Sequence, residues 1–474
     1  MNNPIKFGTD GWRAVIADDF TFANVRFCAQ GAADYLKEKG LAERSVYIGY
    51  DRRFASEDFA AAAAEVMAGN GIKVYLSPKA IPTPWVSFGV IIKKCGGGIA
   101  ITASHNPARW NGFKFREETG ASVSSETSLE VEKHIDRAFN TGKVNSMPLS
   151  QALHDQSVEY LDLTPYYVQS ISKLIDLKSL QNAGLNIIVD SMYGVGSGYF
   201  KALLSSGSTK VTEINAERNP AFPGINPEPI AVNLQKILAL VPEQKASVGL
   251  ATDGDADRIG IIDEKGNFLT QLQVFALLAL YLLEIRRERG PLVKTITSTA
   301  MLDRLGELYN VPVIETSVGF KYVAPIMIAQ NALIGGEESG GYGFRGHIPE
   351  RDAIPAGLYF LDFMVKTGKT PSQLLEYLYS KVGEHYYDRI DIHFPEEKRQ
   401  AIIKRVRDGA PKSIENVKVA RLDTSDGFRF ILEDHSWLLI RFSGTEPILR
   451  IYTENNSTER VKRLLKFGRE LAGV

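Results

Sequence analysis

The strongest constraint on the fold of this chain is a pattern of short apolar segments and helical segments that occurs three times. In its first occurrence, the segments 46–50, 72–76 and 98–101 have the apolar character of strands, and the segments 59–67 and 84–92 have the periodicity of helices. The apolar segments of the second and third occurrences are 186–190, 211–214 and 247–251, followed by 293–297, 311–315 and 332–334. Alternation of this kind predicts β-α-β-α-β units, in which helices connect parallel strands.

The length of the chain predicts several domains, because 474 residues exceed the ~150 residues of a typical domain about threefold. After about residue 384 the pattern changes to short strands with tight turns, and the chain ends in an amphipathic helix that includes Val461 and Leu465. We therefore expect an α/β protein with three consecutive mixed α/β domains of the β-α-β-α-β type around a central cleft, and a C-terminal α+β domain with an antiparallel sheet. The expected domains are residues 1–150, 151–255, 256–375 and 376–474.

The composition excludes several classes of protein. The 55 Lys and Arg residues balance the 56 Asp and Glu residues, so we expect no binding to nucleic acid or to a membrane surface. The longest apolar segment, 274–283, is shorter than the ~20 residues that span a bilayer and predicts a buried helix. The N-terminal sequence lacks a secretory signal, and Cys28 and Cys95 have no CxxC spacing. These features predict a cytoplasmic protein.

A polar loop follows the last strand of each β-α-β-α-β unit. The loops are residues 102–107, 252–258 and 335–341. Because parallel α/β sheets bind ligands beyond the carboxyl ends of their strands, we expect these three loops to face one cleft. A fourth polar loop, residues 441–447, lies in the C-terminal part of the chain.

The second loop predicts a metal site. Asp253, Asp255 and Asp257 alternate along the chain, and alternate side chains of an extended segment share one face, where three carboxylates repel one another unless a hard cation joins them. Mg²⁺ is the natural candidate, and Arg258 suggests a phosphate group close to it. An EF-hand is disfavoured because its sixth position would be Arg258 instead of glycine. A solvated acidic turn is the alternative.

The first loop places Ser104 beside His105, which invites comparison with serine hydrolases. The G-x-S-x-G motif is absent, however, and adjacent side chains of an extended segment point to opposite sides, so we expect His105 to be poorly placed to deprotonate Ser104. The residues instead favour a Ser104 that accepts and donates a phosphoryl group, with Lys114 handling protons or phosphate. A structural serine in a turn is the alternative.

The third and fourth loops predict binding of a sugar phosphate. Glu337, Glu338 and Ser339 offer two carboxylates and a hydroxyl in a glycine-rich loop, which suits hydrogen bonds to sugar hydroxyls. Glycoside hydrolysis is disfavoured because it needs carboxyl groups that face each other across a bond. The fourth loop offers a phosphate clamp made of a guanidinium, two hydroxyls and free backbone N–H groups, although a hairpin exit capped by Ser and Thr is the alternative. The residues of this clamp are Arg441, Ser443, Gly444 and Thr445.

Together, the four loops in this order resemble the α-D-phosphohexomutase superfamily, which includes phosphoglucomutases, phosphomannomutases and phosphoglucosamine mutases. The segment 7–13, FGTDGWR, is a fifth motif of the resemblance, which covers essentially the whole chain. It implies an isomerase in which a phosphoserine donates its phosphoryl group to a hexose phosphate and regains the other phosphate from the resulting 1,6-bisphosphate. A mobile C-terminal domain would close over this intermediate and keep water out.

The resemblance implies a catalytic role for five residues besides the three aspartates. Ser104 would be the phosphoserine, and its phosphate would bind Mg²⁺ together with the three aspartates. Lys114 would be the general acid or base, and His105 would orient the loop. Arg13 and Arg258 would lie near the transferring phosphoryl group.

The resemblance also implies a substrate. Glu337 and Ser339, or Glu338, would contact the sugar, and the clamp of the fourth loop would hold the phosphate that is not reacting. Enzymes that use both mannose and glucose phosphates often carry a histidine where this chain has Gly341, so glucose 1-phosphate and glucose 6-phosphate are the expected substrates. Glucose 1,6-bisphosphate would be activator and intermediate. His347 is hypothesised to replace the missing histidine in proton transfer, the alternative being an ordinary loop histidine.

Other functions stay open at this point. Phosphomannomutase or phosphoglucosamine mutase activity is the first alternative. A metal-dependent sugar-phosphate phosphatase would share the phosphoserine and the metal, and a silent sugar-phosphate-binding regulator would need only the clamp. We expect a small hexose phosphate as the partner, and a monomer or a homodimer.

Overall fold

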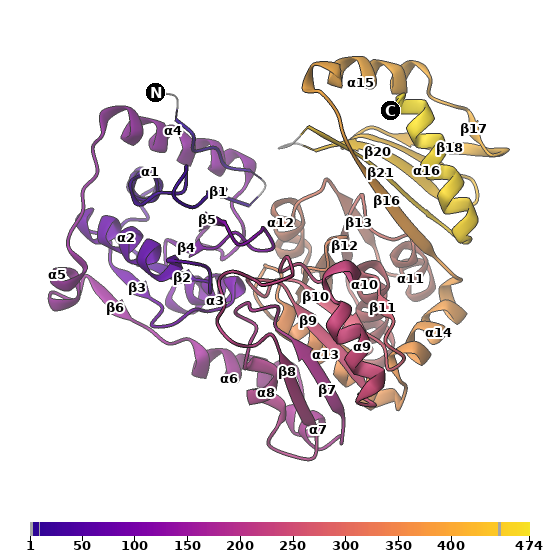
Figure 1. The fold of residues 1–474 in the computed structure, drawn as a ribbon, viewed down its shortest axis with the longest axis horizontal. Helices are drawn as coiled ribbons and strands as arrows, with labels where there is room; N and C mark the ends of the chain where they lie inside the picture. The colour runs from indigo at the N-terminus through magenta and orange to yellow at the C-terminus, as the bar shows by residue number, and fades with distance from the viewer. Residues whose placement is uncertain (1–2, 9, 444–446) are drawn as a thin grey trace.

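The computed structural model describes residues 3–8, 10–443 and 447–474. Within these ranges the strands form four sheets, which the chain visits in order (Figure 1). The first three sheets contain both parallel and antiparallel pairs, and the strands of the last one pair antiparallel. The predicted fold class is therefore confirmed.

The first sheet has the strand order β1-β5-β4-β2-β3-β6. Its strands are β1 (Trp12–Val15), β2 (Val46–Tyr50), β3 (Val74–Leu76), β4 (Gly97–Ile101), β5 (Trp110–Arg116) and β6 (Val158–Tyr160). Its helices are α1 (Phe22–Glu38), α2 (Ser56–Gly69), α3 (Thr83–Lys93), α4 (Ser125–Thr141) and α5 (Leu149–His154). The strands β2, β3 and β4 are parallel, as the periodicity predicts. The added strand β5 runs antiparallel to β4 and pairs Lys114 with Ala100, close to the loop that follows β4.

The second sheet has the order β11-β10-β9-β7-β8. Its strands are β7 (Asn186–Asp190), β8 (Lys210–Ile214), β9 (Val248–Thr252), β10 (Ile259–Ile262) and β11 (Phe268–Leu269). The helical segments of this region are α6 (Thr164–Leu174), α7 (Leu177–Gln181), α8 (Tyr199–Leu204), η1 (Ala231–Asn233) and α9 (Gln235–Glu243). The acidic loop is the tight connection between β9 and β10, which pair antiparallel.

The third sheet has the order β13-β12-β14-β15. Its strands are β12 (Leu292–Thr295), β13 (Val313–Thr316), β14 (Ile334–Gly336) and β15 (Tyr342–Phe344). Its helical segments are α10 (Gln271–Leu280), η2 (Tyr281–Ile285), α11 (Met301–Tyr309), α12 (Phe320–Gln330), α13 (Ala353–Thr367) and α14 (Pro371–Val382). The segment 274–283 lies in α10 and η2 and is buried throughout, so the predicted buried helix is confirmed.

The fourth sheet has the order β16-β21-β20-β19-β18-β17. Its strands are β16 (Tyr386–His393), β17 (Ser413–Ile414), β18 (Val417–Asp423), β19 (Phe428–Leu432), β20 (Trp437–Phe442) and β21 (Ile448–Asn455). Its helical segments are η3 (Glu396–Lys398), α15 (Arg399–Asp408) and α16 (Thr458–Ala472). The amphipathic α16 buries Val461, Leu464 and Leu465 against this sheet.

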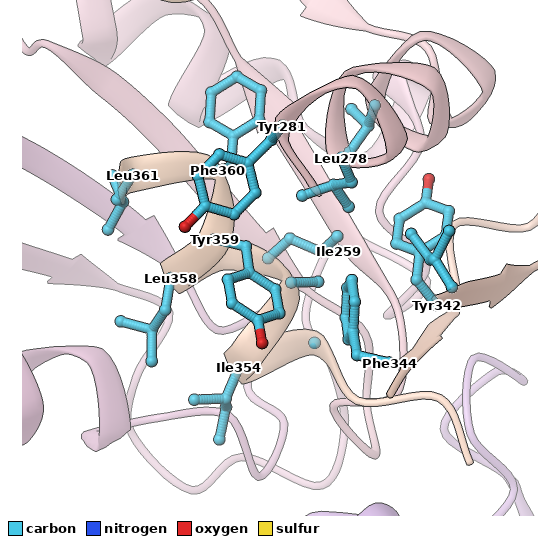
Figure 2. Close-up of a cluster of buried hydrophobic side chains, with 14 of the residues drawn as sticks. Ile259, Leu278, Tyr281, Tyr342, Phe344, Ile354, Leu358, Tyr359, Phe360 and Leu361 are labelled. Atoms are coloured by element: carbon cyan, nitrogen blue, oxygen red, sulfur yellow. The ribbon is translucent and has the colours of Figure 1, made fainter. Parts of the chain in front are cut away.

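One apolar core joins the regions of the first three sheets. It contains Trp85 of α3, Phe200 of α8 and Leu278 of α10, all completely buried. Figure 2 shows the part of this core where Tyr359 of α13 lies beside Phe344 of β15. The C-terminal sheet has its own core with α15 and α16. Because the first three regions share a packed interior, their loops are held at fixed positions relative to one another.

The strand pairing bears on where the domains divide. Strand β6 pairs with β3 in the first sheet, and β10 and β11 pair within the second sheet. The expected boundaries at 150 and 255 would separate hydrogen-bonded strands, and the boundary at 375 would divide α14. We propose that the domains divide after β6, after β11 and after α14.

The described part of the chain contains no helix that is both long and apolar enough to cross a membrane.

Candidate active site

The structure brings three of the four polar loops together at the carboxyl ends of β4, β9 and β14. Oγ of Ser104 donates a hydrogen bond to Oδ2 of Asp253 at 2.9 Å, which joins the first loop to the second. The guanidinium of Arg351 lies 2.9 Å from Oδ2 of Asp257 and 3.2 Å from Oε2 of Glu337, which joins the second loop to the third. The three loops therefore line one site.

The aspartates of the acidic loop form a cluster that fits a hard divalent cation. One carboxylate oxygen from each lies within 4.8 Å of those of the other two, and all three side chains are buried. Oδ1 of Asp255 and Oδ1 of Asp257 are buried without a hydrogen-bond partner, which is costly unless an ion binds them. A site built from carboxylate oxygens matches the ligand preference of Mg²⁺.

The cluster is held in shape by its own backbone. Oδ1 of Asp253 accepts the N–H groups of Asp257 and Arg258 at 3.0 and 3.1 Å. Burial and the carboxylates of Asp255 and Asp257 raise the pKa of Asp253 well above its usual value. Burial alone would also raise the pKa of Asp255, but the charge of Lys114 and the hydrogen bonds that Asp255 accepts, from Lys114 and Thr83 among others, together outweigh it, so the pKa of Asp255 is lowered. The mutual repulsion of the three aspartate carboxylates is an electrostatic cost that a bound cation would remove.

Ser104 has an unusual backbone conformation. It is almost completely buried and has a φ of 51°, in the left-handed region that is uncommon for residues other than glycine. Its Oγ lies 3.3 Å from Nδ1 of His105. The expectation that the two side chains point apart is therefore wrong, because it assumed an extended chain and the chain turns at Ser104. Burial, followed by the positive charges of Arg258 and Arg13, lowers the pKa of His105 well below its usual value, which favours a neutral ring.

Lys114 projects from β5 into the same site and is completely buried. Its Nζ lies 2.7 Å from Oδ2 of Asp10 and 2.9 Å from Oδ2 of Asp255. Burial lowers the pKa of Lys114, but these two carboxylates and that of Asp257 together outweigh it, so the pKa is raised and the side chain is an ammonium. Asp10 also binds Nη1 of Arg116 at 2.8 Å. Asp10 belongs to the FGTDGWR motif, but the sequence alone did not indicate its contacts within the site.

The two arginines expected near the phosphoryl group both reach this region. Nη1 of Arg13 donates to Oδ1 of Asn106 at 2.7 Å, which places the guanidinium over the Ser104 loop. Nε of Arg258 lies 3.8 Å from Asp257 and its Nη1 lies 3.4 Å from Glu228. Arg13 therefore lies at the Ser104 loop and Arg258 at the edge of the acidic cluster, and a guanidinium in either place can bind a phosphate oxygen.

Arg351 is the central residue that sequence reasoning missed. Besides Asp257 and Glu337, it binds Glu350 at 3.1 Å and Asp10 at 3.3 Å, and its side chain is 7% exposed. Burial lowers the pKa of Arg351, but the surrounding carboxylates outweigh it and raise the pKa well above its usual value. The one signal in the sequence is a charged triplet, residues 350–352, directly before the apolar helix α13.

The two glutamates of the third loop have different partners. Glu337 is buried and binds Arg351 within the site. Oε1 of Glu338 accepts hydrogen bonds from the hydroxyl of Tyr387 at 2.8 Å and Nη1 of Arg389 at 2.7 Å, both from β16 of the C-terminal sheet. Ser339 is half-buried beside them. The loop therefore places Glu337 in the site and ties Glu338 to the C-terminal region.

The fourth loop is described in part. Nε of Arg441 lies 3.0 Å from Oδ1 of Asp426, whose Oδ2 accepts the N–H of Val318 at 2.9 Å. Ser443 is buried and its N–H donates to the carbonyl of Ile448 at 2.8 Å. Gly444 and Thr445 lie outside the described residues.

His347 is placed in a buried aromatic cluster. Its Nε2 lies 2.9 Å from Oδ2 of Asp352, which also accepts the hydroxyl of Tyr167 at 2.6 Å. Its ring stacks on Phe88 with 6.5 Å between the ring centroids. These are the contacts of a packed structural histidine, and they give no support to a role in proton transfer.

Comparison with known proteins shows the same four-part organisation along the whole chain. Four family models match, described as phosphoglucomutase/phosphomannomutase alpha/beta/alpha domains I, II and III and the C-terminal domain. They match residues 4–141, 165–266, 271–382 and 396–470.

Individual relatives align with this chain over nearly their full lengths. A phosphoglucomutase/phosphomannomutase of Thermococcus kodakarensis is 32% identical, with 98% of each chain covered. A probable phosphoglucosamine mutase of Methanosphaera stadtmanae is 29% identical, again with 98% of each chain covered. A solved structure from Thermus thermophilus, provisionally named a phosphomannomutase, superposes with a TM-score of 0.86 at 35% identity, with 100% of both chains covered.

Proposed function

Since this chain belongs to the phosphoglucomutase/phosphomannomutase family and is a phosphohexomutase, we propose that it interconverts glucose 1-phosphate and glucose 6-phosphate through a phosphorylated Ser104. The observation that carries the proposal is the 2.9 Å hydrogen bond between Oγ of Ser104 and Asp253 of the buried acidic cluster. A serine hydroxyl next to a cation site is the arrangement that phosphoryl transfer needs, because the reaction depends mainly on alignment and neutralisation of charge.

We assign the cation site to Mg²⁺, held by Asp253, Asp255 and Asp257 together with the phosphate on Ser104. The unpartnered Oδ1 atoms of Asp255 and Asp257 support this assignment. When bound, the cation would offset the negative charge of the transferring phosphoryl group.

The remaining steps are assigned to residues of the chain. The sugar hydroxyl attacks phosphorus, the bond from phosphorus to Oγ of Ser104 breaks, and Arg13 and Arg258 bind the phosphoryl oxygens. Lys114, held as an ammonium by Asp10 and Asp255, donates a proton to the departing Oγ. The proton of the sugar hydroxyl replaces it, so Lys114 ends the half-reaction protonated. The neutral ring of His105 orients Oγ.

Recognition of the substrate is assigned to the third and fourth loops. Glu337 and Ser339 would contact sugar hydroxyls, whereas Glu338 is already bound by β16. Arg441 and Ser443 would contact the second phosphate, together with Gly444 and Thr445 of the same loop. Glucose 1,6-bisphosphate would form in the site, turn around and return the other phosphate to Ser104.

Two other sugar phosphates are candidate substrates. The pairing of Glu338 with Ser339 favours glucose phosphates, but similar proteins include ones named for glucosamine and mannose phosphates. Glucosamine phosphate and mannose phosphate are therefore tested as alternative substrates.

The test is a coupled assay of glucose 6-phosphate formation from glucose 1-phosphate with Mg²⁺ and a trace of glucose 1,6-bisphosphate. Wild type and Ser104→Ala are compared, and mannose 1-phosphate and glucosamine 1-phosphate are tested both as competitors and as substrates. Turnover that is lost in Ser104→Ala supports the proposal, and the competitors rank the sugars. Release of inorganic phosphate without isomerisation would indicate a phosphatase, and no turnover of any sugar would contradict the proposal.

A further inference from the structure

Arg53 is a completely buried arginine that the steps above do not use. It lies between β2 and α2, and its guanidinium donates hydrogen bonds to four backbone carbonyls, three in the segment that connects β4 to β5 and one at the first residue of β5. The acceptors are the carbonyl oxygens of Ser104 at 2.6 Å, Asn106 at 2.6 Å, Pro107 at 2.9 Å and Trp110 at 3.0 Å. One side chain therefore binds the phosphoryl-accepting loop at both ends.

These carbonyls need a partner of this kind. The loop leaves the sheet after β4, and a buried carbonyl without a hydrogen-bond partner destabilises the fold. Nη2 of Arg53 binds the carbonyls of both Ser104 and Asn106, which fixes the peptide planes that follow these two residues. The left-handed φ of Ser104, which turns its Oγ toward Asp253, is supported by these bonds.

Arg53 is itself held rigidly. Its Nε lies 3.2 Å from Oδ2 of Asp51, and Oδ1 of Asp51 accepts the N–H of Arg53 at 2.9 Å and the hydroxyl of Ser56 at 2.7 Å. The ring of Phe222 lies 5.0 Å from the guanidinium carbon. Phe222 belongs to the segment after β8, in the region that supplies the acidic cluster. Arg53 is thus packed between the Ser104 loop and the region that supplies the metal ligands.

We propose that Arg53 is a positioning residue for phosphoryl transfer. It shapes the Ser104 loop so that Oγ faces the acidic cluster, and it acts through the backbone without touching the sugar. This inference rests on the proposed role of Ser104. It predicts that loss of the guanidinium slows transfer to and from Ser104 more than it weakens substrate binding.

The test compares Arg53→Lys with the matched control Arg52→Lys. Nη1 of Arg52 donates to the carbonyl of Ala216 at 2.7 Å, so the control also removes an arginine bond to backbone but leaves the Ser104 loop intact. Each variant is measured for thermal unfolding, kcat, KM and phosphorylation of Ser104 by glucose 1,6-bisphosphate. Because lysine cannot bind all four carbonyls, we expect kcat and the rate of Ser104 phosphorylation to fall about 100-fold in Arg53→Lys, with KM little changed. Arg52→Lys should retain wild-type kcat.

A milder variant, Asp51→Asn, tests the same inference if Arg53→Lys fails to fold. It removes the charge that orients Nε and should lower kcat in the same direction by a smaller factor. Wild-type kcat in a folded Arg53→Lys or Asp51→Asn protein would overturn this inference alone. An inactive wild type, with no phosphate on Ser104, would overturn the proposed function and this inference with it.

Discussion

Replacement of Arg351 by methionine tests whether this guanidinium compensates the charge of the buried carboxylates in the site. The side chain is 7% exposed and binds carboxylates of Asp10, Asp257, Glu337 and Glu350 at 2.9–3.3 Å. Methionine keeps much of the volume but removes the charge, which leaves buried carboxylates without compensation. Breaking a buried ion pair costs about 3–5 kcal/mol, and four carboxylates share this guanidinium, so the upper part of that range is expected.

The assay is thermal unfolding with and without Mg²⁺. A loss of about 3–5 kcal/mol corresponds to a decrease in Tm of roughly 6–20 °C for a unit of 150–250 residues. Because removal of Arg351 increases the repulsion around Asp257, Mg²⁺ should raise the Tm of Arg351→Met more than it raises that of wild type. The decrease in the Tm of Arg351→Met relative to wild type should therefore be largest after chelation of the metal.

The matched control is Arg389→Met. Arg389 binds Glu338 at 2.7 Å, but its side chain is 39% exposed, so its loss should cost no more than about 1 kcal/mol. The reasoning is refuted if Arg351→Met and Arg389→Met unfold at the same temperature. It is also refuted if Mg²⁺ shifts the Tm of Arg351→Met no more than that of wild type.

Three further predictions concern activity. In steady-state kinetics, chelation of divalent cations should abolish turnover and added Mg²⁺ should restore it. Turnover by Asp255→Asn should stay at least about 100-fold slower than that of wild type even at high Mg²⁺. Lys114→Met should lower kcat about 10²–10⁴-fold because it removes the proton donor, and an unchanged kcat would rule that role out. Glu337→Gln should raise KM about 10-fold because it removes the proposed contact with the sugar, whereas Glu338→Gln should leave KM nearly unchanged. Equal effects of the two changes on KM would contradict the different roles proposed for the two residues.

Much of the fold could be predicted from the sequence because local periodicity reports on strands and helices. The parallel strands β2, β3 and β4 and the helices between them follow the predicted pattern. The antiparallel additions β10, β11 and β15 have two to four residues each, which is too short to show a period of two against the neighbouring loops. Strands β10 and β11 shift the second proposed domain division, whereas the first is shifted by β6 and the third by α14.

The site was predictable where its residues stand in one loop and not where they come from distant segments. Asp253, Asp255 and Asp257 are neighbours in sequence, and their clustering follows from local geometry. Arg351 and Asp10 are 341 positions apart, and only the packed fold brings them into contact. The relation of Ser104 to His105 was mispredicted because a left-handed residue breaks the alternation of an extended chain.

The most direct test of the central claim is to locate a phosphoryl group on the protein. The enzyme is incubated with glucose 1,6-bisphosphate and Mg²⁺, and its intact mass and peptide masses are measured before and after addition of glucose 1-phosphate. We expect one added phosphoryl group on Ser104, absent from Ser104→Ala, that passes to glucose 1-phosphate and forms the bisphosphate. Isomerisation by an enzyme that carries no phosphate on Ser104, or turnover that persists in Ser104→Ala, would contradict this claim.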